Sequence, residues 1–197
     1  MQEDRYDLPE GDLLDRVDAL HQHRRRTSAE ILLLVSEFAK QHSPDTVDPI
    51  TVRLPGRQRP VRLGGEGTPL VAESAPAVLA ARLQLSAYAG GRLVADVLDL
   101  EHRLPHLWAR VRALEVDEQH ARFVAKKTRG LTVEEAAYVD ARIAPSADGR
   151  MSWTRFETLV EAAITAADPD ATVAYLAEAL LTTGDDTRWT PAGSRRA

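Results

Sequence analysis

The chain has 197 residues and is 44% hydrophobic but only 5% aromatic, with a net charge of −5. These values allow one core of small aliphatic residues, and they exclude a molecule basic enough overall to attract nucleic acid. The absence of cysteine excludes disulfides, thiol nucleophiles and cysteine-bound zinc. The acidic N-terminus lacks a signal-peptide core, and no apolar run approaches the roughly 18 residues of a membrane span, so we expect a cytoplasmic protein without membrane contact.

The first predicted element is a long helix, or two collinear helices, over residues 11 to 42, after a flexible segment of residues 1 to 10. Six apolar residues and two polar ones recur there at alternating steps of four and three, which keeps them on one helix face. They are Leu13, Val17, Leu20, Arg24, Thr27, Ile31, Leu34 and Phe38. Because Arg24 and Thr27 interrupt this stripe, we favour its packing onto the domain over self-pairing as a coiled coil. Ser28 is a candidate cap for a second helix.

Residues 50 to 63 predict a small two-stranded β-ribbon. β-branched and basic residues alternate there around a Pro55-Gly56 turn, as in a hairpin. The outward face of the ribbon would carry Arg53, Arg57, Arg59 and Arg62. These arginines are candidate nucleic-acid contacts, although an exposed hairpin also uses charge to prevent edge-to-edge aggregation, and both interpretations stay open.

From residue 71 onward the chain predicts a succession of helices. They cover residues 76–85, 87–103, 105–114, 118–128, 133–144, 153–167 and 169–181. The first two are also compatible with a DNA-binding helix-turn-helix, although such helix pairs are common in other proteins. The predicted fold is therefore mainly α, a multi-helix bundle over residues 11 to 182 with a long N-terminal helix and the small two-stranded ribbon, followed by a disordered tail at 183 to 197.

Residues that favour helix ends support these boundaries. N-cap residues precede three of the helices, a capping box precedes a fourth, and a glycine follows one helix as its expected C-terminal cap. In chain order these are Ser86, Asp117, Gly130, Thr132 with Glu135, and Ser152. Trp108 is expected to anchor the core in the short helix after Pro105.

No group of residues has the arrangement of a catalytic or metal site. His102 and His106 have the spacing of a helical metal pair, but Pro105 lies between them and interrupts the helix face. Asp96, Asp99 and Arg103 share a face and are interpreted as ion pairing on an exposed helix. We therefore expect no catalytic residues, no metal and no cofactor.

The segment from Asp117 to Gly130 is the strongest candidate for binding. Arg122, Lys126 and Arg129 recur at steps of four and three on one helix face, and Lys127 lies beside them. Such a basic stripe could follow a phosphate backbone. It could equally be a solvated helix face, and the sequence does not decide between the two.

Several motifs in one order, over residues 28 to 172, resemble the domain of unknown function 222 family. They are Val-Arg-Leu-Gly-Gly-Glu-Gly-Thr-Pro at 61–69, Val-Ala-Glu at 71–73, Ala-Asp-Val-Leu-Asp-Leu-Glu-His-Arg-Leu-Pro at 95–105, Trp-Ala-Arg at 108–110, Thr-Arg-Gly-Leu-Thr-Val-Glu-Glu-Ala-Ala-Tyr-Val-Asp-Ala-Arg at 128–142 and Ser-Trp-Thr-Arg-Phe at 152–156. In that family the helical domain usually precedes an HNH endonuclease module. The resemblance therefore implies a helical fold and a DNA-associated context.

The HNH module itself is missing from this chain, which has no cysteine pairs and no histidine after His120. Our leading expectation is a non-catalytic, DNA-associated targeting or regulatory domain. It would bind DNA through the arginines of the ribbon and the basic stripe at residues 122 to 129. The alternatives are a protein-interaction or homodimerisation module that uses the Leu13 to Phe38 stripe, and part of an HNH-type nuclease whose catalytic module is absent.

Overall fold

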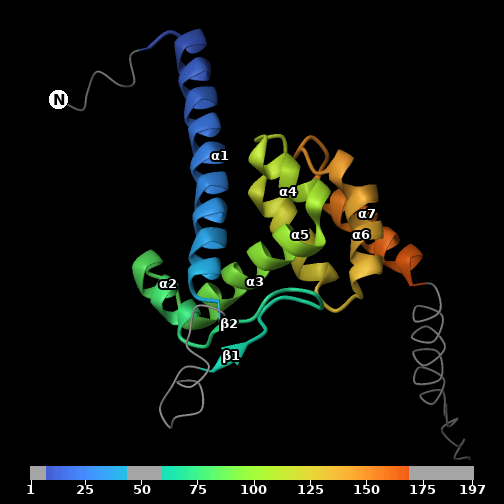
Figure 1. The fold of residues 1–197 in the computed structure, drawn as a ribbon. Coiled ribbons are helices and arrows are strands. Elements are labelled where there is room, and N and C mark those ends of the chain that lie inside the picture. The colour runs from blue at the N-terminus through green and yellow to red at the C-terminus, as the bar shows by residue number, and fades with distance from the viewer. Residues whose placement is uncertain (1–7, 44–58, 169–197) are drawn as a thin grey trace, which may run out of the picture.

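The structure is a computed structural model, and it describes residues 8–43 and 59–168. Within these ranges the chain is mainly helical and contains one small antiparallel pair of strands (Figure 1). In chain order the elements are α1 (Glu10–Gln41), β1 (Pro60–Val61), β2 (Val71–Ala72), α2 (Ala75–Leu83), α3 (Ala87–Arg103), α4 (Pro105–Arg112), α5 (Glu118–Thr128), α6 (Val133–Ile143), the 3-10 turn η4 (Ala144–Ser146) and α7 (Trp153–Ala167). The predicted fold class is confirmed.

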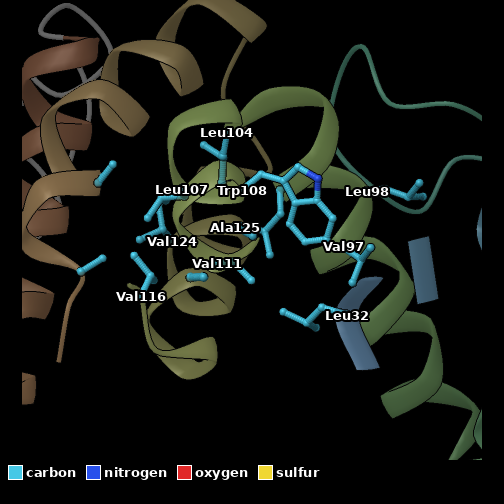
Figure 2. Close-up of a cluster of buried hydrophobic side chains, with 14 of the residues drawn as sticks. Leu32, Val97, Leu98, Leu104, Leu107, Trp108, Val111, Val116, Val124 and Ala125 are labelled. Atoms are coloured by element: carbon cyan, nitrogen blue, oxygen red, sulfur yellow. The ribbon is translucent and has the colours of Figure 1, made fainter. Parts of the chain in front are cut away.

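The core lies where α3 and α4 meet α1 and α5 (Figure 2). Trp108 of α4 is 8% exposed, and its indole lies among aliphatic side chains contributed by these helices. The other labelled members of this buried cluster are Leu32, Val97, Leu98, Leu104, Leu107, Val111, Val116, Val124 and Ala125. The prediction that Trp108 anchors the core is confirmed. A second set of contacts joins α6 to α7 through Val139, Phe156 and Val160.

Local side-chain caps mark the N-termini of α3, α5 and α6. The Ser86 hydroxyl accepts a hydrogen bond from the Ala89 amide, and Asp117 accepts one from Gln119, so each side chain satisfies an N-terminal amide of its helix. Thr132 and Glu135 form the predicted capping box at α6. Ser152 occupies the predicted N-cap position of α7 without a side-chain hydrogen bond.

Two predicted helix ends are wrong. α1 is a single helix through Ser28, which therefore caps nothing. Gly130 is also not a left-handed cap, because the positive-φ glycines among the described residues are Gly67 and Gly149. The free carbonyl groups at the C-terminus of α5 are instead hydrogen-bonded by a residue of another helix, because Arg103 of α3 donates to the oxygens of Thr128 and Arg129.

The strand pairing differs from the predicted hairpin. β1 pairs with β2 in antiparallel register, Pro60 opposite Ala72 and Val61 opposite Val71. The glycine-rich residues 64 to 67 therefore lie in the connection between the two strands. The predicted partner strand at 50–54 and its turn lie outside the described residues, as do residues 1–7 of the segment 1–10 predicted to be flexible, the predicted helix at 169–181 and the predicted tail at 183–197. The sequence missed β2 because two residues are too short a segment to show alternation.

The prediction that the 4-3 stripe of α1 packs onto the domain is wrong. The buried positions of α1 are Ala29, Leu32, Val35, Ser36 and Ala39, which lie on a different side of the helix from the stripe. Ile31 and Leu34 are exposed between them. Only the C-terminal half of α1 therefore contacts the other helices, and the N-terminal half projects away from them (Figure 1).

Candidate interaction surfaces

Two aspartates of α3 organise the charged residues around it. Asp96 is 2% exposed and Asp99 is fully buried. The two oxygens of Asp96 accept hydrogen bonds from Arg122 at 3.0 Å and from Arg129 at 2.7 Å. Asp99 binds Arg129 at 2.7 Å and Arg103 at 3.3 Å. We call these five residues the Asp96–Asp99 network. It corrects the expectation that the aspartates lie on an exposed face, although the Asp99–Arg103 pair itself is confirmed.

Arg103 connects this network to two backbone segments. Its Nη1 donates to the Thr128 oxygen at 3.1 Å, and its Nη2 donates to the Leu131 oxygen at 2.5 Å. The Gly65 amide in turn donates to Asp99 at 2.7 Å. A Cβ at Gly65 would lie 2.0 Å from the Arg103 guanidinium, so only glycine fits there. The loop before β2 and the α5–α6 turn are thus held against α3 by one buried guanidinium and one buried carboxylate.

The predicted basic stripe on α5 does not face solvent as a unit. Arg122 is bound to Asp96 and, at 2.9 Å, to Glu118, whereas Arg129 is bound to both buried aspartates. Burial alone would lower the pKa of the Arg122 guanidinium, but its hydrogen bonds to Glu118 and Asp96 raise that pKa above its ordinary value. Both arginines therefore stay charged, and buried or neighbouring carboxylates compensate their charge.

The two lysines of α5 differ from these arginines. Lys126 is exposed, and Lys127 pairs with Glu161 of α7 at 3.2 Å while its ammonium lies 5.5 Å from the Phe123 ring centre. Of the ribbon arginines, Arg59 is exposed beside β1, and Arg62 donates to the Thr68 oxygen at 2.8 Å. Arg53 and Arg57 lie outside the described residues. The ribbon's loop meets the end of α5 at Gly65, but it does so through buried contacts.

A shallow hollow between α3, α5 and α7 combines cations with aromatic rings. Arg92 and Lys126 line it beside Phe123 and the 40% exposed Trp153, with Asp96 and Arg122 also contributing. Phe123 and Trp153 contact each other edge to face, with ring centres 5.0 Å apart. The sequence did not indicate this hollow, because its residues come from three helices that are far apart in the chain.

The outer face of α1 carries a row of exposed apolar side chains. All residues from Glu10 to Arg24 are exposed; we call this segment the N-terminal arm. The arm leaves the helical body at Arg25, which donates to the Leu114 oxygen at 2.9 Å. Along the arm Val17 is 63% exposed and Leu20 56%, and Leu34 further along the helix is 62% exposed. We call the eight residues of the 4-3 pattern, Leu13 to Phe38, the outer stripe; Phe38 alone among them is half-buried.

The histidine pair considered as a metal site has other contacts. The His106 ring nitrogen lies 2.9 Å from Asp140, a buried carboxylate of α6 that also accepts hydrogen bonds from the His106 and Leu107 amides. Asp140 therefore caps the N-terminus of α4 from a neighbouring helix. Within residues 8–43 and 59–168, no cluster of three or more histidine or carboxylate side chains could hold a metal ion. No helix in these ranges is both long and apolar enough to cross a membrane.

The fold and these surfaces define a helical domain in which buried charges lock a core and one long helix projects from it. The family described as Domain of unknown function (DUF222) matches residues 17–184, and the chain belongs to this family. No curated protein and no solved structure matches the chain.

Proposed function

We propose that this chain is a protein-interaction module that binds an amphipathic helix along the outer stripe of α1. The observation that carries this proposal is the N-terminal arm, a segment of fifteen exposed helical residues with a row of leucine and valine side chains on one face. A helix of that length is marginally stable in water by itself. Contiguous exposed apolar surface of this kind is typical of sites that bind other proteins.

The test compares partners retained by a tagged chain expressed in its native host. The test variant replaces Val17 and Leu20 with glutamine, which removes apolar surface while keeping helix propensity. The matched control replaces Val78 and Tyr138, exposed apolar residues on α2 and α6, with glutamine. We expect the wild type and the control to retain the same polypeptides, including untagged copies of this chain, and V17Q/L20Q to lose them. Equal retention by all three proteins contradicts the proposal.

A second candidate function is association with DNA as a non-catalytic targeting or regulatory domain. The hollow formed by Arg92, Lys126, Phe123 and Trp153 favours it, because cations bind phosphates and exposed aromatic rings stack on bases. The predicted contacts Arg122 and Arg129 contribute less to this proposal, since carboxylates already pair with them. Arg59, Arg62 and Lys127 remain predicted contacts.

Binding of a labelled oligonucleotide across a salt series tests this second function. R92A/K126A should weaken binding and reduce the slope of log affinity against log salt by about two phosphate contacts. R112A/R142A, which removes two exposed arginines elsewhere, is the matched control. Absence of binding at low salt contradicts the DNA proposal. R122A and R129A are unsuitable variants because they would leave buried aspartates without partners.

A further inference from the structure

We infer that the helix that covers the outer stripe is α1 of a second copy of this chain, running antiparallel to the first. This inference rests on the proposed function, because it names the partner of the same surface. It starts from the order of residues along the stripe, which is Leu13, Val17, Leu20, Arg24, Thr27, Ile31, Leu34 and Phe38. Three apolar positions stand at each end and two polar positions stand in the middle.

This order matches itself when one copy is turned end to end. The antiparallel register places Leu13 opposite Phe38, Val17 opposite Leu34 and Leu20 opposite Ile31, so each of the three apolar stripe residues of the arm faces an apolar stripe residue of the C-terminal half. Arg24 then faces Thr27 at the centre, next to the two-fold axis. The register also accounts for the exposure of Ile31 and Leu34, which lie beyond the arm on a half of α1 whose other side is packed.

Other arrangements of two α1 helices are less favourable. A parallel pair in register would place Arg24 against Arg24 and Thr27 against Thr27 in the contact seam, with like charges together. An antiparallel pair displaced by seven residues would place Leu20 against Arg24 and Val17 against Thr27. The first arrangement places arginine against arginine, and the second places apolar against polar side chains, whereas the proposed register pairs apolar with apolar residues and Arg24 with the neutral Thr27.

The residues that flank the stripe have complementary charges in the same register. In an antiparallel pair, the positions just before Val17 and Phe38 lie beside each other across the seam. These positions are Arg16 of one copy and Glu37 of the other. His23 and Glu30 form the next such pair. Glu37 also contacts Lys40 of its own helix at 2.8 Å but stays 63% exposed, so it remains accessible to Arg16.

The antiparallel pair is isologous: both copies use the same surface, and the two-fold axis closes the assembly at two chains. The side of α1 that holds Ala29, Leu32 and Val35 packs on its own body, so the outer stripe stays accessible to the second copy. A helical body then lies at each end of the paired helices, on opposite sides.

Chemical crosslinking tests the inference cleanly because the chain contains no cysteine. The double variant L20C/I31C places two thiols roughly 16 Å apart along one helix, beyond the reach of a short bis-maleimide within one chain. In the antiparallel dimer, each Leu20→Cys thiol faces an Ile31→Cys thiol of the second copy. We expect covalent dimer from the double variant and monomer from L20C or I31C alone. V78C/Y138C measures crosslinking by random collision.

The possible results separate this inference from the proposed function. Covalent dimer from L20C alone indicates a parallel pair and overturns the antiparallel orientation, although the surface is still used. A dimer by light scattering without any stripe crosslink overturns the stripe as the self-association surface. A monomer at all concentrations overturns the second copy as partner, while partners from the host that depend on Val17 and Leu20 would still support the proposed function.

Discussion

Helices α1 and α3 distribute apolar and charged residues in opposite ways. α1 exposes Leu20 and Leu34 to more than half of their full extent, whereas α3 buries Asp96 and Asp99 almost completely. A buried carboxylate is costly unless charged donors surround it, and α3 has such donors on α5 and on its own last turn. The exposed leucines of α1 have no comparable compensation within the described residues.

This difference shows that the two helices have different roles. The charges of α3 act inside the molecule, where they join the loop at Gly65 to the turn between α5 and α6. The apolar stripe of α1 contributes little to the folded monomer, because the packed residues of that helix lie on another side. Substitutions in α3 should therefore affect folding, and substitutions in the stripe should affect association.

The largest expected effect is the loss of a buried carboxylate. Asp99→Ala should lower the free energy of unfolding by about 3–5 kcal/mol, because Arg103 would keep its buried charge without a compensating partner. Asp15→Ala, on the exposed arm, is the control and should change it by less than about 0.5 kcal/mol. Urea unfolding measures both. Equal values for the two variants would mean that the network does not stabilise the fold.

The next effect concerns the loop that the network holds. Gly65→Ala should destabilise the protein by about 1–3 kcal/mol, because the added methyl group overlaps the Arg103 guanidinium and the Arg129 oxygen. Gly130→Ala is the matched control, since a Cβ there meets nothing within 4 Å and the backbone has no positive φ. That control should be neutral or stabilising by up to about 1 kcal/mol. A smaller loss for G65A than for G130A would contradict the described packing.

A smaller, pH-dependent effect is expected where α1 joins α3. Burial alone would raise the pKa of Glu101, but hydrogen bonds from Lys40 and from Ser36 at 2.5 Å lower it below its ordinary 4.5. The ionised Glu101 therefore stabilises the fold above pH 4.5, and this contribution is lost as the pH falls through the lowered pKa. The melting temperature of the wild type should exceed that of E101Q at pH 7, and the difference should shrink below pH 4.5. A constant difference across this range would indicate that the charge has no role.

The smallest effect on the monomer is expected in the outer stripe. V17Q/L20Q should change the free energy of unfolding of a dilute sample by less than about 0.5 kcal/mol, because both residues are already exposed. The melting temperature of the wild type should rise with protein concentration because self-association stabilises the folded state, whereas that of the variant should stay constant. A large loss of stability at high dilution would show that the stripe contributes to the monomer fold after all.

Much of the helical fold could be read from the sequence because its signals are local. Ser86, Asp117 and the Thr132–Glu135 box mark helix starts that the structure confirms, and Trp108 is buried as predicted. The errors concern features that depend on distant residues. Gly130 was taken as the cap of α5, but the capping group is Arg103, 26 residues before Arg129 in the chain.

The candidate surfaces show the same limit. The 4-3 spacing identified the outer stripe correctly as one helix face, but α1 contains a second series, Ala29, Leu32, Val35 and Ala39, that competes for the core. Smaller residues at Ala29 and Ala39 allow close helix approach, and this was the signal that could have identified the packed face. The spacing likewise placed Arg122 and Arg129 correctly on one face of α5. Whether these side chains are free to bind a ligand depended on Asp96 and Asp99 of α3, which pair with them.

The sequence by itself determined the helices, most of their ends and the family, because backbone capping and apolar periodicity act over a few residues. Only the tertiary structure decided which residues face solvent. Charges of α3 became buried because donors from α5 and from its own last turn surround them, and leucines of α1 stayed exposed because its other side fits the core. Burial depends on which helices meet, and that is a property of the whole packed chain.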